Sequence, residues 1–340
     1  MRNVLNLSIL TFFMRYLLGI ETTAHTFGVS VLDMDGKILS NEKDSYVTKT
    51  GGMIPMEVRK HHESVAPTIY EKALEIAGIN ADEIEVIAFS NAPGLAPSLL
   101  EGMKFVKEKA LELGIGVIQV NHCIAHLEIG EITGAKDPVL LYASGANTQV
   151  IAYEAGKYRV FGETLDLGVG NFIDTFARFI GLGFPGGPKI EELSVDGKEL
   201  IDLPYSVKGM DVSFSGMQTK LKNLFDKGNR VEDLSYSMQE TAFAMLVEVA
   251  ERALAHTGKK ELLLGGGVAC NKRLQEMCRI MCEERGVKFF CPPNSFLVDN
   301  AGMIGYLGLK MYKVGFVEKD LDKVDIKPRE RTDDVGVFWR

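Results

Sequence analysis

Pro138-Val-Leu-Leu-Tyr-Ala-Ser-Gly-Ala-Asn-Thr-Gln-Val-Ile-Ala-Tyr153 is the most informative run of the sequence. It consists of two apolar segments typical of buried strands, on either side of the small polar turn Ser144–Thr148. A glycine turn at Ala155–Lys157 then leads into a third apolar segment, Tyr158–Phe161. Glycine and short hydroxyl side chains let backbone N–H groups approach an anion without a Cβ in the way. Ser144–Thr148 is therefore a candidate phosphate loop, although the pattern also suits an ordinary hairpin.

The same arrangement occurs once earlier in the chain. Its parts are the strand Tyr16–Ile20, the polar turn Glu21–His25, the strand Phe27–Val31, the glycine turn Asp35–Lys37 and the strand Ile38–Ser40. Such an internal repeat predicts a duplicated supersecondary unit. With one small turn in each copy, we expect two loops that close on a single phosphate chain from two lobes, as in actin and the sugar kinases.

Further helical and strand patterns follow each repeat. Helical periodicity covers residues 56–78, 97–114, 231–257 and 269–285, and short apolar runs cover residues 84–90, 117–120 and 261–264. The alternation predicts an α/β fold with a mixed sheet in each half, covered by helices. We therefore expect a duplicated actin-like ATPase fold, with residues 14–136 as the first lobe and 137–297 as the second. A helix over residues 298–325 is expected to pack back on the first lobe.

A third glycine-rich run supports a nucleotide site. Leu262-Leu-Leu-Gly-Gly-Gly-Val-Ala-Cys-Asn271 predicts a buried strand that ends in glycines and opens a helix. A helix N-terminus preceded by glycines can accept a nucleotide against bare backbone, although tight packing alone would also use glycine. The run matches neither a dinucleotide fingerprint nor a P-loop. Phe184-Pro-Gly-Gly-Pro-Lys189, just before Glu191, predicts a rigid turn suited to a ribose or a base.

A pair of histidines suggests a metal site. His122 and His126 follow the strand at residues 117–120, and on a helix residues four apart share a face. A structural histidine pair would look the same, but the carboxyl end of a strand is where open α/β sheets bind ligands. Asp299 and Tyr142 are candidate further ligands, and such a set would suit iron or zinc. Cys123 stands where a zinc protease of the HExxH type needs glutamate, so that class is unsupported.

Composition limits the partners and the compartment. The 340 residues favour two domains, and a formal net charge of −8 excludes a surface that binds nucleic acid all over. Two local groups of cations are candidate contacts for RNA: Lys104, Lys107 and Lys109, and Lys220, Lys222, Lys227 and Arg230. Five cysteines without a CxxC pair favour a reducing compartment, here the cytoplasm. The apolar run Val4–Phe13 is too short to span a membrane, and residues 1–13 are expected to be an extension or a mis-assigned start.

Taken together, the patches resemble the universal tRNA threonylcarbamoyladenosine synthase family in its archaeal and eukaryotic branch, the catalytic subunit of the KEOPS complex. These proteins were once described as O-sialoglycoprotein endopeptidases. The likeness runs from about Met14 to about Val335. Its motifs are Gly19-Ile-Glu-Thr-Thr-Ala-His25, Asn121-His-Cys-Ile-Ala-His126, Tyr142-Ala-Ser-Gly-Ala-Asn-Thr-Gln149, Gly168-Val-Gly-Asn-Phe-Ile-Asp174, Gly183-Phe-Pro-Gly-Gly-Pro-Lys189, Ser213-Phe-Ser-Gly216, Gln239-Glu-Thr-Ala-Phe243, Gly265-Gly-Gly-Val-Ala269 and Arg331-Thr-Asp333.

The resemblance implies a set of site residues. The metal ligands of the family fall on His122, His126, Tyr142 and Asp299. Its substrate and nucleotide contacts fall on Tyr142, Ala143, Ser144, Gly145, Ala146, Asp174, Gly187, Glu191 and Asn271. The chain departs from the family at Ala146, where a glycine is usual and where a Cβ would narrow the phosphate pocket. It also departs at Asn91–Gly94, usually richer in glycine, and at Met53–Met56, usually a His-Pro step.

The resemblance also implies a reaction. The expected activity transfers threonylcarbamoyl from threonylcarbamoyl-adenylate to N6 of the adenosine next to the anticodon in tRNAs that read ANN codons, with metal assistance and release of AMP. His25 and Glu21 are candidates for positioning the reactants or moving a proton, whereas His61 and His62 are expected to serve packing or partner contact. The expected cofactors are one metal ion, with iron favoured over zinc, the AMP moiety of the adenylate, and magnesium as an open addition.

The expected partners are tRNA and KEOPS-type subunits, including a small protein kinase that could dock near residues 56–78. Two other functions suit the same fold. A phosphotransferase of the sugar or acetate kinase type would bind magnesium through phosphates and carboxylates, so the histidine pair counts against it. A non-catalytic scaffold could have lost its metal ligands, whereas all four candidates are present here.

Overall fold

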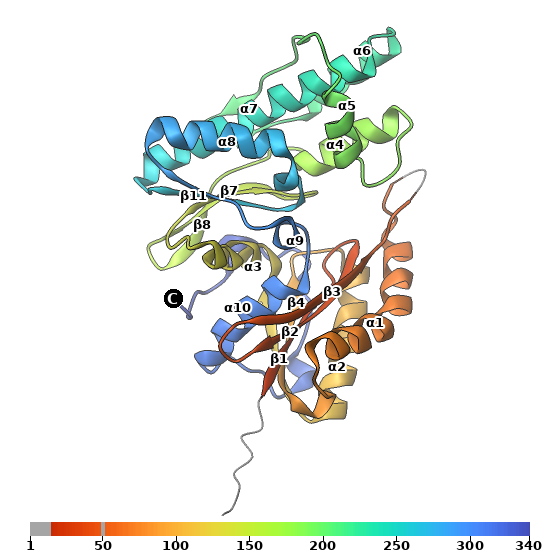
Figure 1. Ribbon diagram of the computed structural model, residues 1–340, viewed down its shortest axis with the longest axis vertical. Coiled ribbons are helices and arrows are strands. Elements are labelled where there is room, and N and C mark those ends of the chain that lie inside the picture. The colour runs from red at the N-terminus through yellow and green to blue at the C-terminus, as the bar shows by residue number, and fades with distance from the viewer. Residues whose placement is uncertain (1–14, 49–51) are drawn as a thin grey trace, which may run out of the picture.

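Two five-stranded sheets organise the chain, and they share one strand order (Figure 1). The computed structural model describes residues 15–48 and 52–340, so the extension expected over residues 1–13 lies outside the described residues. The first sheet has the order β3-β2-β1-β4-β5, with bounds Tyr16–Glu21 (β1), Thr26–Asp33 (β2), Ile38–Ser45 (β3), Ile84–Ala92 (β4) and Gly116–Asn121 (β5). The second, written in the same direction, has the order β8-β7-β6-β11-β12. Its bounds are Val139–Ala143 (β6), Thr148–Glu154 (β7), Lys157–Glu163 (β8), Glu261–Gly265 (β11) and Lys288–Phe290 (β12).

Strand directions confirm the duplication predicted from the sequence. β1 pairs antiparallel with β2 and parallel with β4, and β6 pairs antiparallel with β7 and parallel with β11. In both copies the small polar turn therefore joins the central strand to its antiparallel neighbour. The expected mixed sheet in each half is confirmed.

Helices cover both sheets. The helices on the first lobe are α1 (Pro55–Ala77), α2 (Ala96–Leu113) and α10 (Ala301–Lys313). Those on the second lobe are α4 (Val169–Phe179), α5 (Gly187–Ser194), α6 (Ser215–Asp226), α7 (Val231–Thr257) and α8 (Lys272–Arg285). Two short helices, α3 (His122–Glu128) and α9 (Asn294–Leu297), lie near the lobe boundary. A two-stranded ribbon, β9 (Val207–Lys208) and β10 (Asp211–Val212), belongs to the second lobe. Among the helices of the described residues, none has the length and apolar character needed to cross a bilayer.

α3 and α10 lie in a layer between the two sheets. Because side chains alternate between the faces of a strand, Leu17 of β1 belongs to the cluster that contains α10, whereas Leu18 faces α1 and α2. In the second sheet Leu140 joins the same central cluster, and Leu141 faces α7 and α8. One apolar core therefore continues from lobe to lobe, and it fixes α3 in place.

Two helix boundaries differ from the sequence expectation. The helix expected over residues 298–325 is helical only at Ala301–Lys313, because Gly315 adopts a left-handed φ of 82° and the next amide closes back on Met311 at 3.0 Å. The helix expected from residue 269 begins at Lys272, because Asn271 is its N-cap and residues 267–270 form a 3-10 turn. Helices α4, α5 and α6 were not predicted.

The C-terminal strap, defined here as residues 325–334, crosses both lobes. In the first lobe the amide of Lys327 donates to the carbonyl of Asn91 at 2.8 Å. In the second lobe the guanidinium of Arg331 donates to Glu163 at 3.2 Å. The strap therefore joins β4 to β8, although these strands belong to different sheets.

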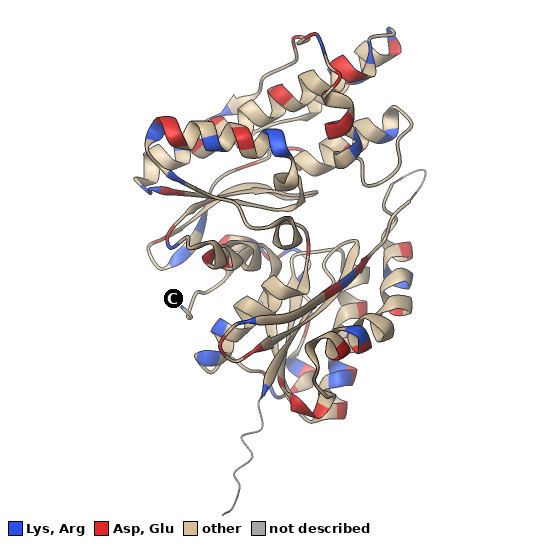
Figure 2. Ribbon diagram, viewed as in Figure 1, with Lys and Arg blue, Asp and Glu red and all other residues tan. Residues whose placement is uncertain are grey.

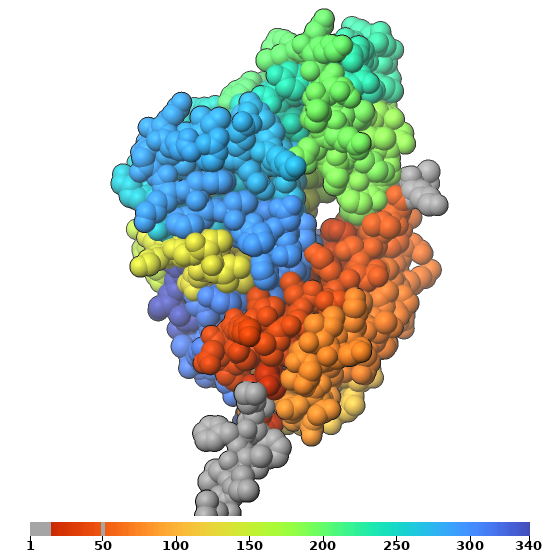
Figure 3. All heavy atoms as spheres, viewed as in Figure 1, coloured from red at the N-terminus to blue at the C-terminus, as the bar shows by residue number. Residues whose placement is uncertain are grey.

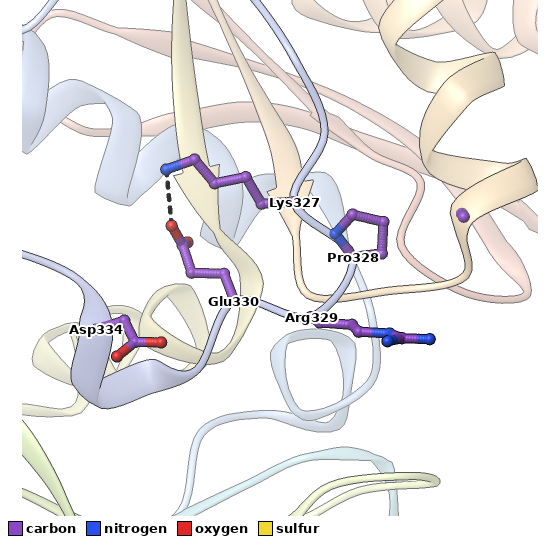
Figure 4. Close-up of a pocket in the computed structure, with 6 residues that line it drawn as sticks. Lys327, Pro328, Arg329, Glu330 and Asp334 are labelled. Carbon is purple, nitrogen blue, oxygen red and sulfur yellow. Dashed lines mark hydrogen bonds and ion pairs between the residues drawn. The ribbon is translucent and has the colours of Figure 1, made fainter.

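A hollow of about 540 Å³ lies along this strap (Figure 4) and is lined by Ala96, Lys327, Pro328, Arg329, Glu330 and Asp334. Figure 4 shows Lys327 paired with Glu330, whereas Arg329 points away from that pair. The carboxylate of Glu330 also accepts from Asn121 Nδ2 at 3.1 Å. The strap thus contacts the residue that begins α3.

Candidate metal and nucleotide site

Helix α3 presents two imidazoles to one point. Asn121 ends β5 and caps the helix, because its side-chain oxygen accepts the amides of Cys123 at 3.0 Å and Ile124 at 3.3 Å. His122 and His126 share a face of this helix, and their ring centroids are 4.7 Å apart. Both rings are buried, with 5% and 1% exposure. The spacing predicted from the sequence therefore does bring the two histidines together.

The first polar turn holds His122 in place. Glu21, at the end of β1, is fully buried, and its Oε2 accepts from His122 Nδ1 at 2.9 Å. Its other oxygen accepts the amide of Thr23 at 2.7 Å and the Thr23 hydroxyl at 2.5 Å. This hydrogen bond keeps a proton on Nδ1 of His122. The other ring nitrogen, Nε2, is therefore available to bind a ligand at the centre of the site.

Asp299 completes a group of three donors. Its Oδ1 lies 3.3 Å from His122 Nε2 and 3.6 Å from His126 Nε2. Burial alone would lower the pKa of His122, but the carboxylates of Glu21 and Asp299 raise it well above its ordinary value. Burial would conversely raise the pKa of Asp299, but the nearby charge of His122 holds it well below its ordinary value. Asp299 is thus a carboxylate that faces both rings.

These donors fit a metal ion. Ligands about 2.0–2.1 Å from a tetrahedral cation lie roughly 3.3–3.4 Å from one another. The carboxylate oxygen of Asp299 is 3.3 and 3.6 Å from the two imidazole nitrogens, and all three donor atoms lie within 4.8 Å of one another. Neither ring nitrogen of His126, nor the hydroxyl of Tyr142, has a hydrogen-bond partner among the described residues, although all are buried. The ring of Tyr142 lies 5.1 Å from that of His126. Unpaired buried donors are costly unless something binds them, and a cation would do so.

Replacing Glu21 by glutamine should weaken metal binding by about 10- to 100-fold, the usual effect of removing a hydrogen bond behind a ligating histidine. Glutamine has the size of glutamate but only one accepting oxygen, so it cannot serve both His122 and Thr23. The measurement is a chelator competition that gives the dissociation constant of the metal. Glu42→Gln is the matched control, because among the described residues Glu42 forms an ion pair only with the exposed Lys72 of α1. Equal affinities in the two variants would contradict this positioning role of Glu21.

The second polar turn leaves amides available. The carbonyls of Ser144 and Gly145 accept the amides of Gly170 and Asn171 at 3.0 and 2.9 Å, so they point toward the start of α4. The amides of Gly145 and Ala146 donate to no group among the described residues. Ala146 itself is exposed. The turn therefore offers N–H groups to an anion, as its composition predicted.

The third glycine run closes against this turn. Gly266, between β11 and the 3-10 turn, has a φ of 88°. A Cβ at Gly266 would lie 2.4 Å from the carbonyl oxygen of Ala143. The backbone of this run thus approaches the second turn as only glycine allows.

The remaining predicted nucleotide contacts meet at one end of the second sheet. Asp174 of α4 accepts the amide of Gly186 at 2.7 Å, directly before Gly187 begins α5. Glu191 of α5 accepts the amide of Lys272 at 2.9 Å, directly after the cap residue Asn271. α4, α5 and the start of α8 are therefore held together by these contacts. Figure 3 shows the surface hollowed where the red and orange first lobe faces the green part of the second.

His25 lies between the two groups. It is half-buried, and its ring is edge-on to Phe184 with centroids 5.3 Å apart. Burial raises the pKa of Asp174, while the charge of His25 acts in the opposite direction. His25 likewise helps to lower the pKa of Asp299. It is therefore within electrostatic reach of both Asp174, a predicted nucleotide contact, and Asp299, a candidate metal ligand.

Three residues of the site were not singled out from the sequence. Lys43 of β3 donates to the backbone carbonyl of Asp299 at 3.1 Å, and so fixes the ligand loop from the first lobe. Gln239 of α7 accepts from Asn271 Nδ2 at 2.7 Å. Asn121 caps α3. Asn121 and Gln239 stand in motifs that carry the family resemblance, whereas no sequence signal marks Lys43.

His61 and His62 of α1 lie next to the first turn. His61 Nε2 is 2.7 Å from Asp44 Oδ1. His62 is fully buried, packs edge-on against Phe27, and has no partner for Nε2 among the described residues. Burial, with the neighbouring His61 charge, lowers the pKa of His62 to about 4.

The pH dependence of stability should report on His62. The unfolded chain takes up a proton at the ordinary pKa of 6.5, but the folded protein does so only at about 4. The free energy of unfolding should therefore fall as the pH falls from 6.5 to 4, by up to roughly 3 kcal/mol. Thermal unfolding of wild type and His62→Gln at pH 7 and pH 4.5 measures this. The variant should lose less stability on acidification. An equal loss in both proteins would contradict the lowered pKa of His62.

Comparison with known proteins identifies relatives over nearly the whole chain. The sequence profile of tRNA N6-adenosine threonylcarbamoyltransferase matches residues 37–306. A tRNA N6-adenosine threonylcarbamoyltransferase of Thermococcus kodakarensis is 53% identical over 323 residues, which are 95% of this chain and 99% of that protein. A protein of Methanocaldococcus jannaschii, named as a probable bifunctional tRNA threonylcarbamoyladenosine biosynthesis protein, is 50% identical over 95% of this chain and 60% of its own length.

Among solved structures the likeness is one of fold. The crystal structure of HypF from Thermococcus kodakarensis superposes with a TM-score of 0.61 at 16% identity, over 91% of this chain and 49% of that one. Identity this low shows the architecture alone. The superposition agrees with the arrangement of the two sheets in two lobes.

Proposed function

This chain belongs to the tRNA N6-adenosine threonylcarbamoyltransferase family, and on that basis we propose how its residues carry out the transfer. The enzyme transfers threonylcarbamoyl from threonylcarbamoyl-adenylate to N6 of the adenosine next to the anticodon in tRNAs that read ANN codons. A bond forms between N6 and the carbamoyl carbon, the bond from that carbon to the phosphate oxygen breaks, N6 loses a proton, and AMP leaves. The observation that carries the proposal is that both polar turns contact the helix that bears His122 and His126. Glu21 of the first turn accepts from His122, and Asn147 of the second turn donates from Nδ2 to Cys123 Sγ at 3.7 Å.

The second turn and the helix ends around it would hold the AMP moiety. The amides of Gly145 and Ala146 face no protein acceptor among the described residues, which suits a phosphate. Asp174, Glu191 and Asn271 surround the adjoining end of the second sheet, and Gly187 has no atom within 4 Å of an added Cβ. These groups suit a ribose and a base beside bare backbone. Tyr142 to Ala146 would then contact both the nucleotide and the reacting group.

His122, His126, Asp299 and Tyr142 would hold one metal ion, which we propose to be iron, with zinc as the alternative. Two histidines and a carboxylate with open positions form the donor set that suits iron(II). When bound, the ion supplies a Lewis acid that polarises a carbonyl or phosphoryl oxygen. Burial raises the pKa of Tyr142 well above its ordinary value, with further contributions from Cys123 and Asp299, so without a cation the phenol keeps its proton.

Two other residues have separate roles in this proposal. Glu21 is a positioning residue, because within the described part of the chain its carboxylate accepts hydrogen bonds only from His122 and Thr23. His25 is the candidate for moving the proton that N6 loses, because it is half-buried and lies near both Asp174 and Asp299. A preserved reaction with a shifted pH profile in His25→Gln would support that role.

We further propose that the enzyme works in the cytoplasm with KEOPS-type subunits, one of them a small protein kinase. The word "bifunctional" in the name of the Methanocaldococcus jannaschii relative supports a physical link to a second activity. The start of α1 supports a docking surface, since Ile54 and Met56 are 56% and 50% exposed.

The test supplies threonylcarbamoyl-adenylate and unmodified tRNA that reads an ANN codon, and measures modified adenosine by mass spectrometry, with and without cognate subunits. Product that depends on added adenylate would support the proposal. No product under any combination, together with turnover of ATP on a small molecule, would contradict it and favour a phosphotransferase.

A further inference from the structure

We propose that a hollow between α4 and α6 is a contact site for the tRNA backbone and for a base beside the target adenosine. This α4–α6 hollow is lined by Thr175, Phe176, Arg178, Phe179, Gln218 and Lys222. The inference rests on the proposed function, because it assigns a surface to the substrate of that reaction.

The cations of the hollow have no ion-pair partners. Over residues 15–48 and 52–340 no salt bridge involves Arg178 or Lys222, and both side chains are exposed. Lys222 Nζ instead lies over the ring of Phe179, 5.1 Å from its centroid. Arg178 and Lys222 therefore keep their charge available, on a chain whose net charge is −8.

In the other candidate group of cations, two of the three lysines are already paired with carboxylates. Lys104 of α2 pairs with Glu101 at 3.1 Å, and Lys109 pairs with Glu112 at 2.8 Å. In Figure 2 acidic and basic residues alternate along α1, α2 and α8. Cations already paired with carboxylates release few counterions when RNA binds, so they contribute little to affinity. The sequence did not distinguish the two groups. The ion pairs favour Lys222 over Lys104 and Lys109, although Arg230 of the second group is itself paired with Glu232 and Asp233.

The hollow has the size and chemistry of a nucleotide contact. Its volume of about 200 Å³ is below the roughly 300–1,000 Å³ of pockets that enclose a whole small molecule, so it suits one flat or compact group. Two phenylalanines, two cations and the side chains of Gln218 and Thr175 line it. Aromatic rings next to cationic side chains are the means by which proteins hold single-stranded nucleotides. No carboxylate lines it.

The position of the hollow links it to the reaction. Arg178 is one helical turn beyond Asp174 on α4, so the two side chains share a face. Its guanidinium also lies against the first lobe, since a Cβ on Gly52 would be 2.6 Å from Arg178 Nη1. The hollow thus adjoins the place where the lobes meet beside the proposed AMP site. A loop of tRNA that presents one adenosine to that site would pass over it.

The experiment measures binding of unmodified tRNA to full-length protein as a function of salt concentration. Arg178→Ala with Lys222→Ala should reduce the slope of log affinity against log salt by about 1.4–1.8, because each lost phosphate contact removes roughly 0.7–0.9. Phe179→Leu should weaken binding about tenfold without changing the slope. Lys104→Ala with Lys109→Ala is the matched control and should keep the wild-type slope, because both lysines are already paired with carboxylates.

Two further readouts separate this inference from others. Thermal unfolding and adenylate binding establish that the double variant is folded, and Lys222→Arg should restore the slope of a Lys222→Ala protein. Because binding is measured without turnover, failure of the transfer reaction leaves this test intact. A folded double variant that keeps the wild-type slope, or a control variant that loses as much, would overturn the proposal.

Discussion

Alanine at both His122 and His126 should slow threonylcarbamoyl transfer by about a thousandfold or more and leave the purified protein without its metal. Lewis-acid assistance supplies several kcal/mol of transition-state stabilisation, and each 1.36 kcal/mol corresponds to a factor of ten in rate. The fold should survive, because alanine favours the helix at both positions and the nitrogens of His126 have no hydrogen-bond partner to lose among the described residues. Metal content by mass spectrometry and single-turnover rates provide the measurement.

The matched control for this pair is His256→Ala. His256 is exposed on α7 and contacts Phe161 edge-on, at the side of the second lobe that is away from α3. This variant should keep both its metal and its rate. If the double variant loses the metal but keeps the transfer rate, the ion has a structural role and does not assist the reaction. One that keeps the metal would contradict the ligand assignment itself.

Alanine at Gly266 should have the largest effect on stability. Its φ of 88° is strained for any L-residue, and the new Cβ would lie 2.4 Å from the carbonyl oxygen of Ala143 and 3.1 Å from the amide of Ser144. We expect a loss of about 3 kcal/mol or more in the free energy of unfolding. For a chain of this length that corresponds to a thermal midpoint lower by roughly 4 °C. Adenylate binding should fall as well, because the second turn must move.

Gly258→Ala separates the strain from the clash. Gly258 also has a positive φ, 70°, but nothing lies within 4 Å of an added Cβ there. Only the backbone penalty remains, about 1 kcal/mol, and adenylate binding should be unchanged. Similar losses of stability in the two variants would show that the approach of Gly266 to the second turn is loose, contrary to this description.

The sequence predicted the sheets because their signal is local. β1 and β2 are apolar runs separated by a short polar turn, β6 and β7 repeat that pattern, and the pairing of each hairpin follows from adjacency in the chain. The histidine pair was likewise readable, since both residues stand on one short helix. Helices α4 to α6 were missed because they are short, at 11, 8 and 12 residues, and each has a glycine among its first two residues.

The rest of the site depends on contacts between distant parts of the chain. The bond from Glu21 to His122 joins residues 101 positions apart, and the contact from Lys43 to Asp299 joins residues 256 positions apart. No local periodicity encodes such contacts, because they follow from the way α3 and α10 pack between the sheets. The C-terminal strap was missed for the same reason: it has little regular structure of its own, and its positions are fixed by Asn91 and Glu163.

The most direct test of the central claim is single-turnover transfer with metal-stripped protein. Threonylcarbamoyl-adenylate, unmodified tRNA and the cognate subunits are supplied to wild type and to His122→Ala with His126→Ala, each before and after iron(II) is restored. We predict that stripped wild type makes almost no modified adenosine, that iron(II) restores the rate, and that the double variant stays inactive in both states. Full-rate transfer by the stripped wild-type protein would contradict the claim that the His122, His126 and Asp299 centre supports the reaction.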